Sequence, residues 1–265
     1  MRVAIISDIH SNYYALKAAI TDIKKQNIDT IIINGDLVTD FPYPNKTIDE
    51  ILKLNNDYNL ILLKGNREEY LENINFNNIS SLNASLIYTY NNLSDEYKEL
   101  LSSLPYSHSI NDIFIAHSSD ISTRELFFED SPNTKEYIDR MNYKMIICGH
   151  SHKAFSLKHN DKIFINTGPL GHFDNSFSGV YLIVDTETYK YEHRYISYDI
   201  NQTYNDFIES GLSDYGLTYT KCIMDMLKKG YCNASEVINK GLSLVQNNKL
   251  EEKYFIEAYK KINGS

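Results

Sequence analysis

Short apolar runs that end in acidic, histidine or glycine turns constrain the fold of this chain most strongly. Residues 3–6, 30–33 and 60–63 are largely apolar without alternation, as expected of strands that are buried on both faces. Residues 15–23 and 45–52, which lie between these runs, have the apolar spacing of helices. Alternating strands and helices at the start of the chain predict βαβ units and a parallel sheet.

The pattern changes from mixed strands and helices to helices alone near residue 200. We therefore expect an α/β domain over residues 1–198 and a helical subdomain or cap over residues 199–265. The turns between the last three expected strands suggest that these strands pair antiparallel. The further expected strands are 114–116, 145–148, 162–165, 180–185 and 190–198, and the expected C-terminal helices are 217–228, 234–245 and 250–262.

Composition excludes several classes of protein. The chain has 265 residues, 42% of them hydrophobic, so it can bury a core and is not disordered as a whole. Its net charge of -9 disfavours non-specific binding to nucleic acid or membranes, because both partners are polyanionic. The first ten residues reach an acid and a histidine too early for a signal peptide, and three widely spaced cysteines make no disulfide framework. We expect a cytosolic protein.

Potential metal ligands follow five of the expected strands. Ligands gather at the carboxyl ends of strands in α/β sheets because the loops there converge over one crevice. A set of imidazoles, carboxylates and one amide without thiolate suits Mn, Fe, Zn or Co better than a structural zinc site. The candidate ligands are Asp8, His10, Asp36, Asn66, His117, His150 and His152.

The order of these residues resembles the calcineurin-like metallophosphoesterase superfamily. The motifs that carry the resemblance are Asp8-x-His10, Gly35-Asp36, Gly65-Asn66, His117 and Gly149-His150-x-His152. The flanking segments SDIHSNYYALKAAI, GDLVTDFPYPN and FINTGPLG are similar to its small bacterial branch, which includes phosphodiesterases and diadenosine tetraphosphate hydrolases. The resemblance covers residues 1–198. It implies an αββα sandwich of two mixed β-sheets flanked by helices, to which the C-terminal helices would be appended.

The resemblance also implies a dinuclear metal site, with Mn or Fe favoured. Asp8, His10, Asp36 and His152 would hold one ion, and Asp36, Asn66, His117 and His150 the other, which makes Asp36 the bridge. Two ions about 3.5–4 Å apart would activate a bridging hydroxide for in-line attack on phosphorus. The implied activity is hydrolysis of phosphodiester or phosphoanhydride bonds.

One departure from the family pattern concerns the leaving group. Family members often have Gly-Asn-His-Asp where this chain has Gly65-Asn66-Arg67-Glu68. Arginine cannot act as a general acid near neutral pH, but its guanidinium can bind a phosphate through two parallel hydrogen bonds. We therefore expect a good leaving group or another acid. Alternatively, Arg67 pairs with Glu68 or Glu69 at a helix start.

Two further residues, Asn12 and His172, are candidates for substrate contacts. His172 follows Gly168-Pro169-Leu170-Gly171, and a surface turn is the alternative for it. The expected partner is a small phosphorylated substrate, with nucleotides among the candidates, and neither long nucleic acid nor a membrane. Oligomerisation through the helical tail stays open. Alternative functions are a dinucleoside polyphosphate hydrolase or protein phosphatase within the family, and a non-catalytic scaffold with the same fold outside it.

Overall fold

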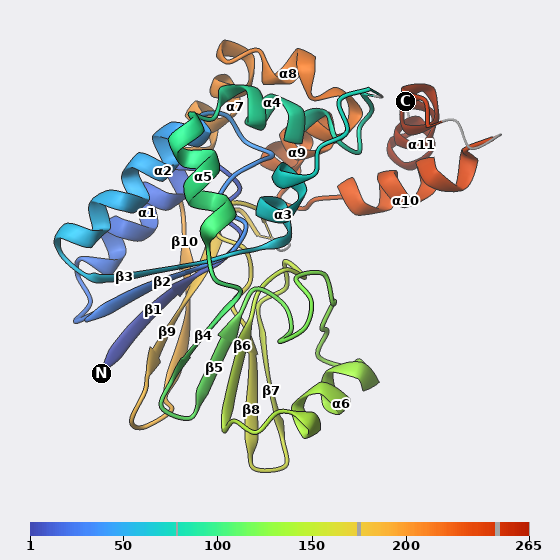
Figure 1. Ribbon diagram of the computed structural model, residues 1–265. Coiled ribbons are helices and arrows are strands. Elements are labelled where there is room, and N and C mark those ends of the chain that lie inside the picture. Colours follow the sequence, from blue (N-terminus) through green and yellow to red (C-terminus); the bar gives the residue numbers. More distant parts are fainter. Residues whose placement is uncertain (78, 174–175, 247–249, 265) are drawn as a thin grey trace.

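Two mixed β-sheets, packed face to face, form the centre of the protein (Figure 1). The structure is a computed structural model that describes residues 1–77, 79–173, 176–246 and 250–264. In spatial order, the first sheet contains β10 (Tyr191–Ile196), β9 (Gly179–Asp185), β1 (Arg2–Ile6), β2 (Thr30–Asn34) and β3 (Asn59–Leu63). The second contains β4 (Ser107–Ile110), β5 (Ile113–Ala116), β6 (Met145–Cys148), β8 (Lys162–Asn166) and β7 (Phe155–His159).

Helices cover the outer face of each sheet, which confirms the αββα sandwich expected from the sequence (Figure 1). The helices on the first sheet are α1 (Tyr13–Ile23), α2 (Pro44–Lys53), α3 (Asn66–Glu72), α4 (Ala84–Asn92) and α5 (Asp95–Ser103), and a short 3-10 helix, η1 (Leu54–Asn56), follows α2. The second sheet is covered by α6 (Pro132–Arg140). The C-terminal helices are α7 (Ile200–Glu209), α8 (Leu212–Tyr215), α9 (Leu217–Lys229), α10 (Ala234–Leu244) and α11 (Glu252–Asn263).

Strand β1 shows why its sequence is apolar without alternation. Val3 and Ile5 point into the core between the two sheets, whereas Ala4 and Ile6 pack under the helices on the outer face. All four residues are at most 1% exposed. Because β1 pairs parallel with β2 and antiparallel with β9, it is a central strand whose two faces are both buried.

The pairing of the later strands differs in part from the expectation. Strands β9 and β10 pair antiparallel, as expected. Strand β8, however, belongs to the other sheet, where it pairs parallel with β6 and antiparallel with β7. The sequence did not predict β4 or β7. Both are short edge strands whose residues are partly exposed, so they lack the buried apolar run that marks the central strands.

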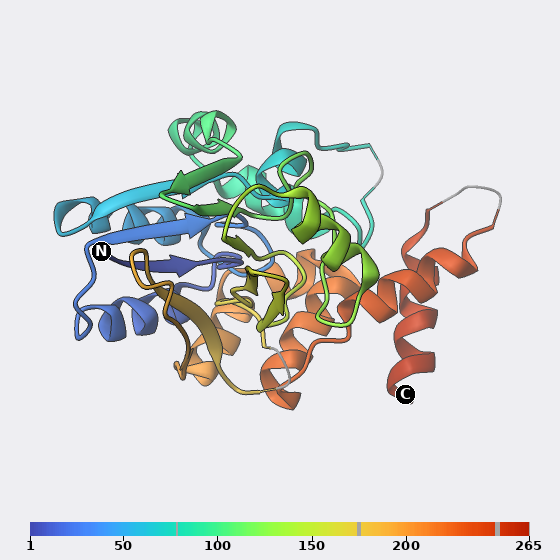
Figure 2. The ribbon, with the colours of Figure 1, turned by 90° about the horizontal axis from the view of Figure 1, so that it is seen from below.

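The C-terminal helices build a core of their own that also reaches the sandwich. Buried residues of α7 and α9, such as Phe207 and Ile223, pack with Phe41 and Phe173 from loops of the α/β part. Helices α10 and α11 lie against each other at the side of the molecule (Figure 2). Within the described ranges, no helix has the length and apolar character needed to cross a bilayer.

Candidate metal centre

The strand ends that carry the candidate ligands meet at one edge of the sandwich. Strands β1, β2 and β3 are parallel neighbours, and so are β5 and β6 in the other sheet. Backbone hydrogen bonds continue between the loops that follow: Asp8 N donates to Gly35 O at 3.2 Å and His10 N to Asp36 O at 2.9 Å. Gly149 N likewise donates to His117 O at 2.9 Å. The loops therefore converge as an extension of the sheets, as loops at the carboxyl ends of strands do.

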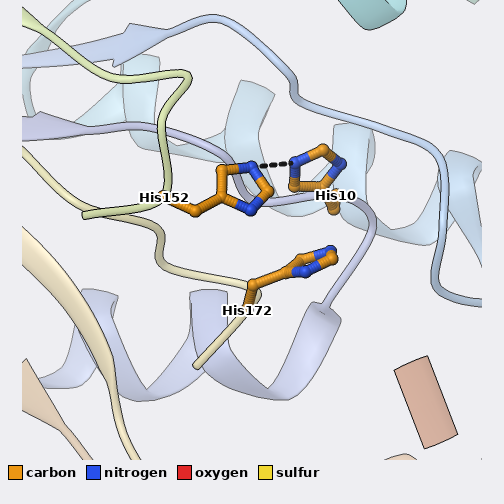
Figure 3. A group of neighbouring side chains, drawn as sticks. All are labelled: His10, His152 and His172. Atoms are coloured by element: carbon orange, nitrogen blue, oxygen red, sulfur yellow. Dashed lines mark hydrogen bonds between the residues drawn. The ribbon is translucent and has the colours of Figure 1, made fainter. Parts of the chain in front are cut away.

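The first ligand group consists of Asp8, His10, Asp36 and His152, whose ligand atoms all lie within 4.8 Å of one another. His10 Nε2 is 3.1 Å from His152 Nε2 (Figure 3) and 3.6 Å from Asp36 Oδ2. His152 Nε2 is 3.2 Å from Asp8 Oδ1. Two carboxylates and two imidazoles thus face a common point.

The second ligand group consists of Asp36, Asn66, His117 and His150. Asp36, His117 and His150 again offer ligand atoms that lie within 4.8 Å of one another. His117 Nε2 lies 3.5 Å from Asp36 Oδ1 and 3.1 Å from Asn66 Oδ1, which brings the amide into the group. Asp36 belongs to both groups and turns a different carboxylate oxygen toward a histidine of each. The structure therefore brings together all seven candidate ligands.

Unusual backbone conformations aim these side chains. Asp8, His10, Asp36, His150 and His152 all have left-handed backbone, with φ between 52° and 65°. This region is uncommon for residues other than glycine, and holding one there costs on the order of 1–3 kcal/mol. Such strain persists only where the surroundings fix it, and here the hydrogen bonds between loops do so. Five strained residues at one edge are typical of a functional site.

Three glycines allow the loops to approach closely. Gly35 has a positive φ of 80°, and a Cβ there would lie 2.6 Å from His117 Nδ1. A Cβ at Gly65 would lie 2.3 Å from Asp36 Oδ1, and one at Gly149 would lie 2.1 Å from Ser7 Oγ. Any side chain at these positions would therefore push the ligands or their supports apart.

Polar partners behind the ligands orient two of the imidazoles, and for His10 they are Asp40 and Thr39 Oγ1, the latter 3.4 Å from Nδ1. His117 Nδ1 donates to Asn34 O at 2.9 Å, which leaves Nε2 as the nitrogen that faces the site. His10 Nδ1 lies 3.3 Å from Asp40 Oδ2, on the side away from the other ligands. A partner on one ring nitrogen fixes the tautomer and raises the basicity of the other, which is the usual arrangement around metal-bound histidine.

The electrostatics of the site fit a divalent cation. Burial, followed by the charge of Asp8, raises the pKa of Asp36 to about 7. Burial and then His117 lower the pKa of His150 to about 3, which keeps its imidazole in the neutral form that binds metals. Asp8 Oδ1 is buried without a hydrogen-bond partner among the described residues. Repelling carboxylates, an orphaned oxygen and neutral imidazoles are all stabilised by a cation between them.

Glu68 supports the site in a way that sequence reasoning missed. Its carboxylate is 1% exposed and accepts hydrogen bonds from the backbone N–H groups of Asp36, Leu37 and Gly65 at 2.8–2.9 Å. It thereby ties the loop after β2 to the start of α3. A glutamate at the third position of a helix is one half of a capping-box signal, and Gly65 stands at the N-cap where that signal has Ser or Thr.

Arg67 does not pair with Glu68 or Glu69, so that alternative from the sequence is wrong. Its Nη2 donates to Asp40 Oδ2 at 3.1 Å and to the Tyr219 hydroxyl at 2.9 Å. Its Nε lies 3.9 Å from Asp36 Oδ2 and is buried without a hydrogen-bond partner in the described part of the chain. The guanidinium therefore lies beside the bridging position with a donor to spare.

Asp40 and Tyr219 are further residues of the site that the sequence did not reveal. Asp40 is fully buried, and its carboxylate also accepts hydrogen bonds from Ser85 Oγ at 3.1 Å and from the Tyr219 hydroxyl at 2.8 Å. Tyr219 lies on α9, so a C-terminal helix reaches the edge of the ligand groups. The pair is 179 positions apart in sequence, and no local pattern could have joined them.

The two remaining candidates lie at the site in different ways. Asn12 donates both amide hydrogens within the protein, to Gly171 O at 2.8 Å and Tyr198 Oη at 2.9 Å, and its oxygen caps α1. His172 is 2% exposed and packs against His10 and His152 with ring centroids 4.6 and 4.7 Å away. The surface-turn alternative for His172 is therefore wrong.

Comparison with known proteins agrees with this geometry. The profile of the calcineurin-like phosphoesterase family matches residues 1–154, and the chain belongs to this family. It is 28% identical over 244 residues to the uncharacterized protein MJ0912 of Methanocaldococcus jannaschii, covering 80% of this chain and 94% of that protein.

Two crystal structures share the fold at 20% sequence identity. The hypothetical protein PH1004 from Pyrococcus horikoshii has a TM-score of 0.76 and covers 86% of this chain and 98% of its own. A metallophosphoesterase from Sphaerobacter thermophilus has a TM-score of 0.73 and covers 87% of this chain and 100% of its own. Since the covered share exceeds residues 1–198, the similarity of fold extends into the C-terminal helices.

Proposed function

We propose that this protein is a dinuclear-metal-dependent phosphoesterase that hydrolyses phosphodiester or phosphoanhydride bonds. The observation that carries the proposal is the position of Asp36, whose two carboxylate oxygens belong to two separate ligand groups. A carboxylate shared in this way is what a bridge between two cations requires. Family membership supports the same class of reaction.

The ligand groups define what the metals would contribute. The first ion would be held by Asp8, His10, Asp36 and His152, and the second by Asp36, Asn66, His117 and His150. When bound, such ions lower the pKa of a coordinated water molecule and neutralise phosphoryl oxygens. Mixed nitrogen and oxygen ligands without thiolate favour Mn or Fe, with Zn and Co as alternatives.

Arg67 would bind the substrate phosphate. Its Nη2 is already anchored to Asp40 and Tyr219, so the guanidinium is pre-organised and its remaining donors are available. Arginine cannot donate a proton to a leaving group at neutral pH. We therefore propose substrates with good leaving groups, such as phosphoanhydrides, aryl phosphates and small nucleotides. The net charge of -9 disfavours long nucleic acid.

Asn12 would position the loops rather than touch substrate, since both of its amide hydrogens are already donated. The proposed division is a catalytic domain over residues 1–198 and a helical cap over residues 199–265. The contact of Tyr219 with Arg67 supports a cap that helps to hold the phosphate-binding residue.

The test separates an enzyme from a scaffold. Purified protein is stripped with a chelator, loaded with Mn or Fe, analysed for metal content, and assayed with bis(p-nitrophenyl) phosphate and dinucleoside polyphosphates. We expect about two ions per chain and turnover that requires them. Two bound ions without turnover on any aryl or nucleotide substrate would support the scaffold alternative, and no bound ions would end the proposal.

A further inference from the structure

Asp40 is a buried carboxylate that contacts both a candidate metal ligand and the arginine beside the site. Its Oδ2 lies 3.1 Å from Arg67 Nη2 and 3.3 Å from His10 Nδ1. Its Oδ1 accepts a hydrogen bond from Ser85 Oγ at 3.1 Å. Because Asp40 is 0% exposed, these neighbours rather than water compensate its charge. Arg67 is the contact that carries a full positive charge at every physiological pH.

The backbone fixes the loop that carries Asp40. Thr39 and Asp40 both have left-handed backbone, with φ of 89° and 66°. Phe41 N donates to His10 O at 3.1 Å, and Thr39 N donates to Ser11 Oγ at 3.0 Å. Strain of this kind persists only where the surroundings hold it. The position of the carboxylate therefore follows from the fold of the loop and does not depend on the arginine that it faces.

The side chain of Arg67 lies within reach of the shared ligand, Asp36. The backbone N–H of Arg67 donates to Asp36 Oδ1 at 2.8 Å, so the side chain begins at a peptide group that is already bound to this carboxylate. The guanidinium Nε lies 3.9 Å from Asp36 Oδ2, beyond hydrogen-bond length. The contact with Asp40 is shorter, at 3.1 Å. Asp40, and not the shared ligand, is therefore the counter-ion of Arg67.

An arginine that paired with Asp36 would compete with the proposed metals. Asp36 offers a different oxygen to each ligand group, and Oδ2 is the one that faces His10. A guanidinium bound to Oδ2 would add positive charge where a cation is to bind. The side chain of Arg67 is only 18% exposed, and a buried charge without its counter-ion is costly. If Asp40 were neutral, Arg67 would turn to Asp36, the other carboxylate within 4 Å of it among the described residues.

We propose that Asp40 is a positioning residue that holds the guanidinium of Arg67 off Asp36, so that Asp36 stays available to two cations. This inference rests on the proposed metal-binding function. It goes beyond that function because it gives a residue outside both ligand groups control over metal affinity. The pair of Asp40 and Arg67 is neutral as a unit. Metal affinity should therefore depend on whether the pair is complete, half-present or absent.

The test is a double-mutant cycle read out as metal binding rather than turnover. Metal-free wild type, Asp40→Asn, Arg67→Ala and the double variant are titrated with Co, and the dissociation constant and the visible d–d absorption are recorded. The matched control is Asp22→Asn. Asp22 also accepts hydrogen bonds from an arginine and a tyrosine, Arg194 and Tyr181, but it lies near the end of α1 and outside both ligand groups. Circular dichroism checks that each variant is folded.

The three variants of the cycle should differ in direction. Asp40→Asn should weaken the tighter site by about tenfold or more, as the loss of a residue behind a ligand does. Arg67→Ala should bind Co more tightly than wild type, because it removes positive charge beside Asp36. The double variant should return to the affinity of wild type, and Asp22→Asn should not differ from it.

A double variant that binds as weakly as Asp40→Asn would overturn the proposal, since Asp40 would then support His10 or its loop without acting through the arginine. Unchanged affinity in Asp40→Asn would do the same. If Asp40→Asn does not fold, Arg67→Ala decides, because unchanged affinity there would mean that the arginine does not influence Asp36. Wild type that binds Co but hydrolyses nothing would refute the proposed function and leave this test intact. Wild type that binds no Co would refute both.

Discussion

The two ligand groups share Asp36 but differ in charge and in construction. The first contains two carboxylates, and all four of its residues have left-handed backbone. Beyond Asp36, the second contains no carboxylate: its other ligands are the amide of Asn66 at the start of α3, His117 at the end of β5, and His150. Coulomb attraction to a divalent ion is therefore stronger at the first position. We infer that the first position fills first and that the second depends on Asp36 for its only anionic ligand.

Replacing the shared ligand should have the largest effect, because it removes charge from both positions. Asp36→Asn should lower metal content below one ion per chain at micromolar metal and reduce kcat/KM more than about 100-fold, the upper effect of losing only a supporting residue. Metal analysis and the aryl phosphate assay measure this. Asp57→Asn, at an exposed position, is the control. Retention of one tight ion would mean that the first group does not need the bridge.

Removing a ligand from one group alone tests whether the positions are separate. His117→Ala should leave one ion per chain instead of two, since the first group keeps all four of its residues. Equilibrium dialysis against Mn gives the stoichiometry, with His108→Ala as a matched control on β4. Simultaneous loss of both ions in a folded variant would contradict the idea of two separable positions.

The pH dependence of binding should report the shared carboxylate. Burial and the charge of Asp8 raise the pKa of Asp36 to about 7, so below that pH the metal-free protein holds a proton that a cation must displace. Affinity should therefore fall about tenfold per pH unit below pH 7 and level off above it. Calorimetry in buffers of different ionisation enthalpy should detect about one proton released at pH 6 and fewer at pH 8. Affinity that is constant from pH 5.5 to 8 would contradict this.

The smallest expected effect is that of a substitution at Tyr219, which lies outside both ligand groups. Tyr219→Phe removes the hydroxyl that donates to Asp40 and accepts from Arg67, without touching a ligand. Metal stoichiometry should stay at that of wild type, while KM rises about fivefold, as expected for the loss of about 1 kcal/mol from one hydrogen bond. Steady-state kinetics measure KM, and metal analysis measures the stoichiometry. The control is Tyr231→Phe, at an exposed position. A loss of metal in Tyr219→Phe would show that the cap supports the ligands themselves.

The sequence predicted the parts of this molecule that depend on local order. Each proposed ligand follows a strand that carries an apolar run, even where that strand, β3, is only partly buried, so strand prediction alone was enough to suggest that the ligands meet at one edge. Strands β4 and β7 were missed because edge strands bury little. The sequence left open whether His172 is buried or in a surface turn, because its burial depends on backbone hydrogen bonds from Leu170 and Gly171 to Ser7 and Asp8, which leave no trace in residue type. Asp40 and Tyr219 needed the fold itself, because long-range packing brings them together.

The bonds between the loops after β1 and β2 have a consequence for the chelated protein. The links from Asp8 to Gly35 and from His10 to Asp36 are hydrogen bonds between backbone groups, and the buried apolar layer between the sheets contains none of the candidate ligands. Small metal-dependent modules unfold when stripped, since their binding energy is their folding energy. Here backbone hydrogen bonds of the fold itself hold the loops that carry the ligands. Chelation should therefore leave a cooperative thermal unfolding transition intact. Reloading should then be a simple second-order step with no slow refolding phase.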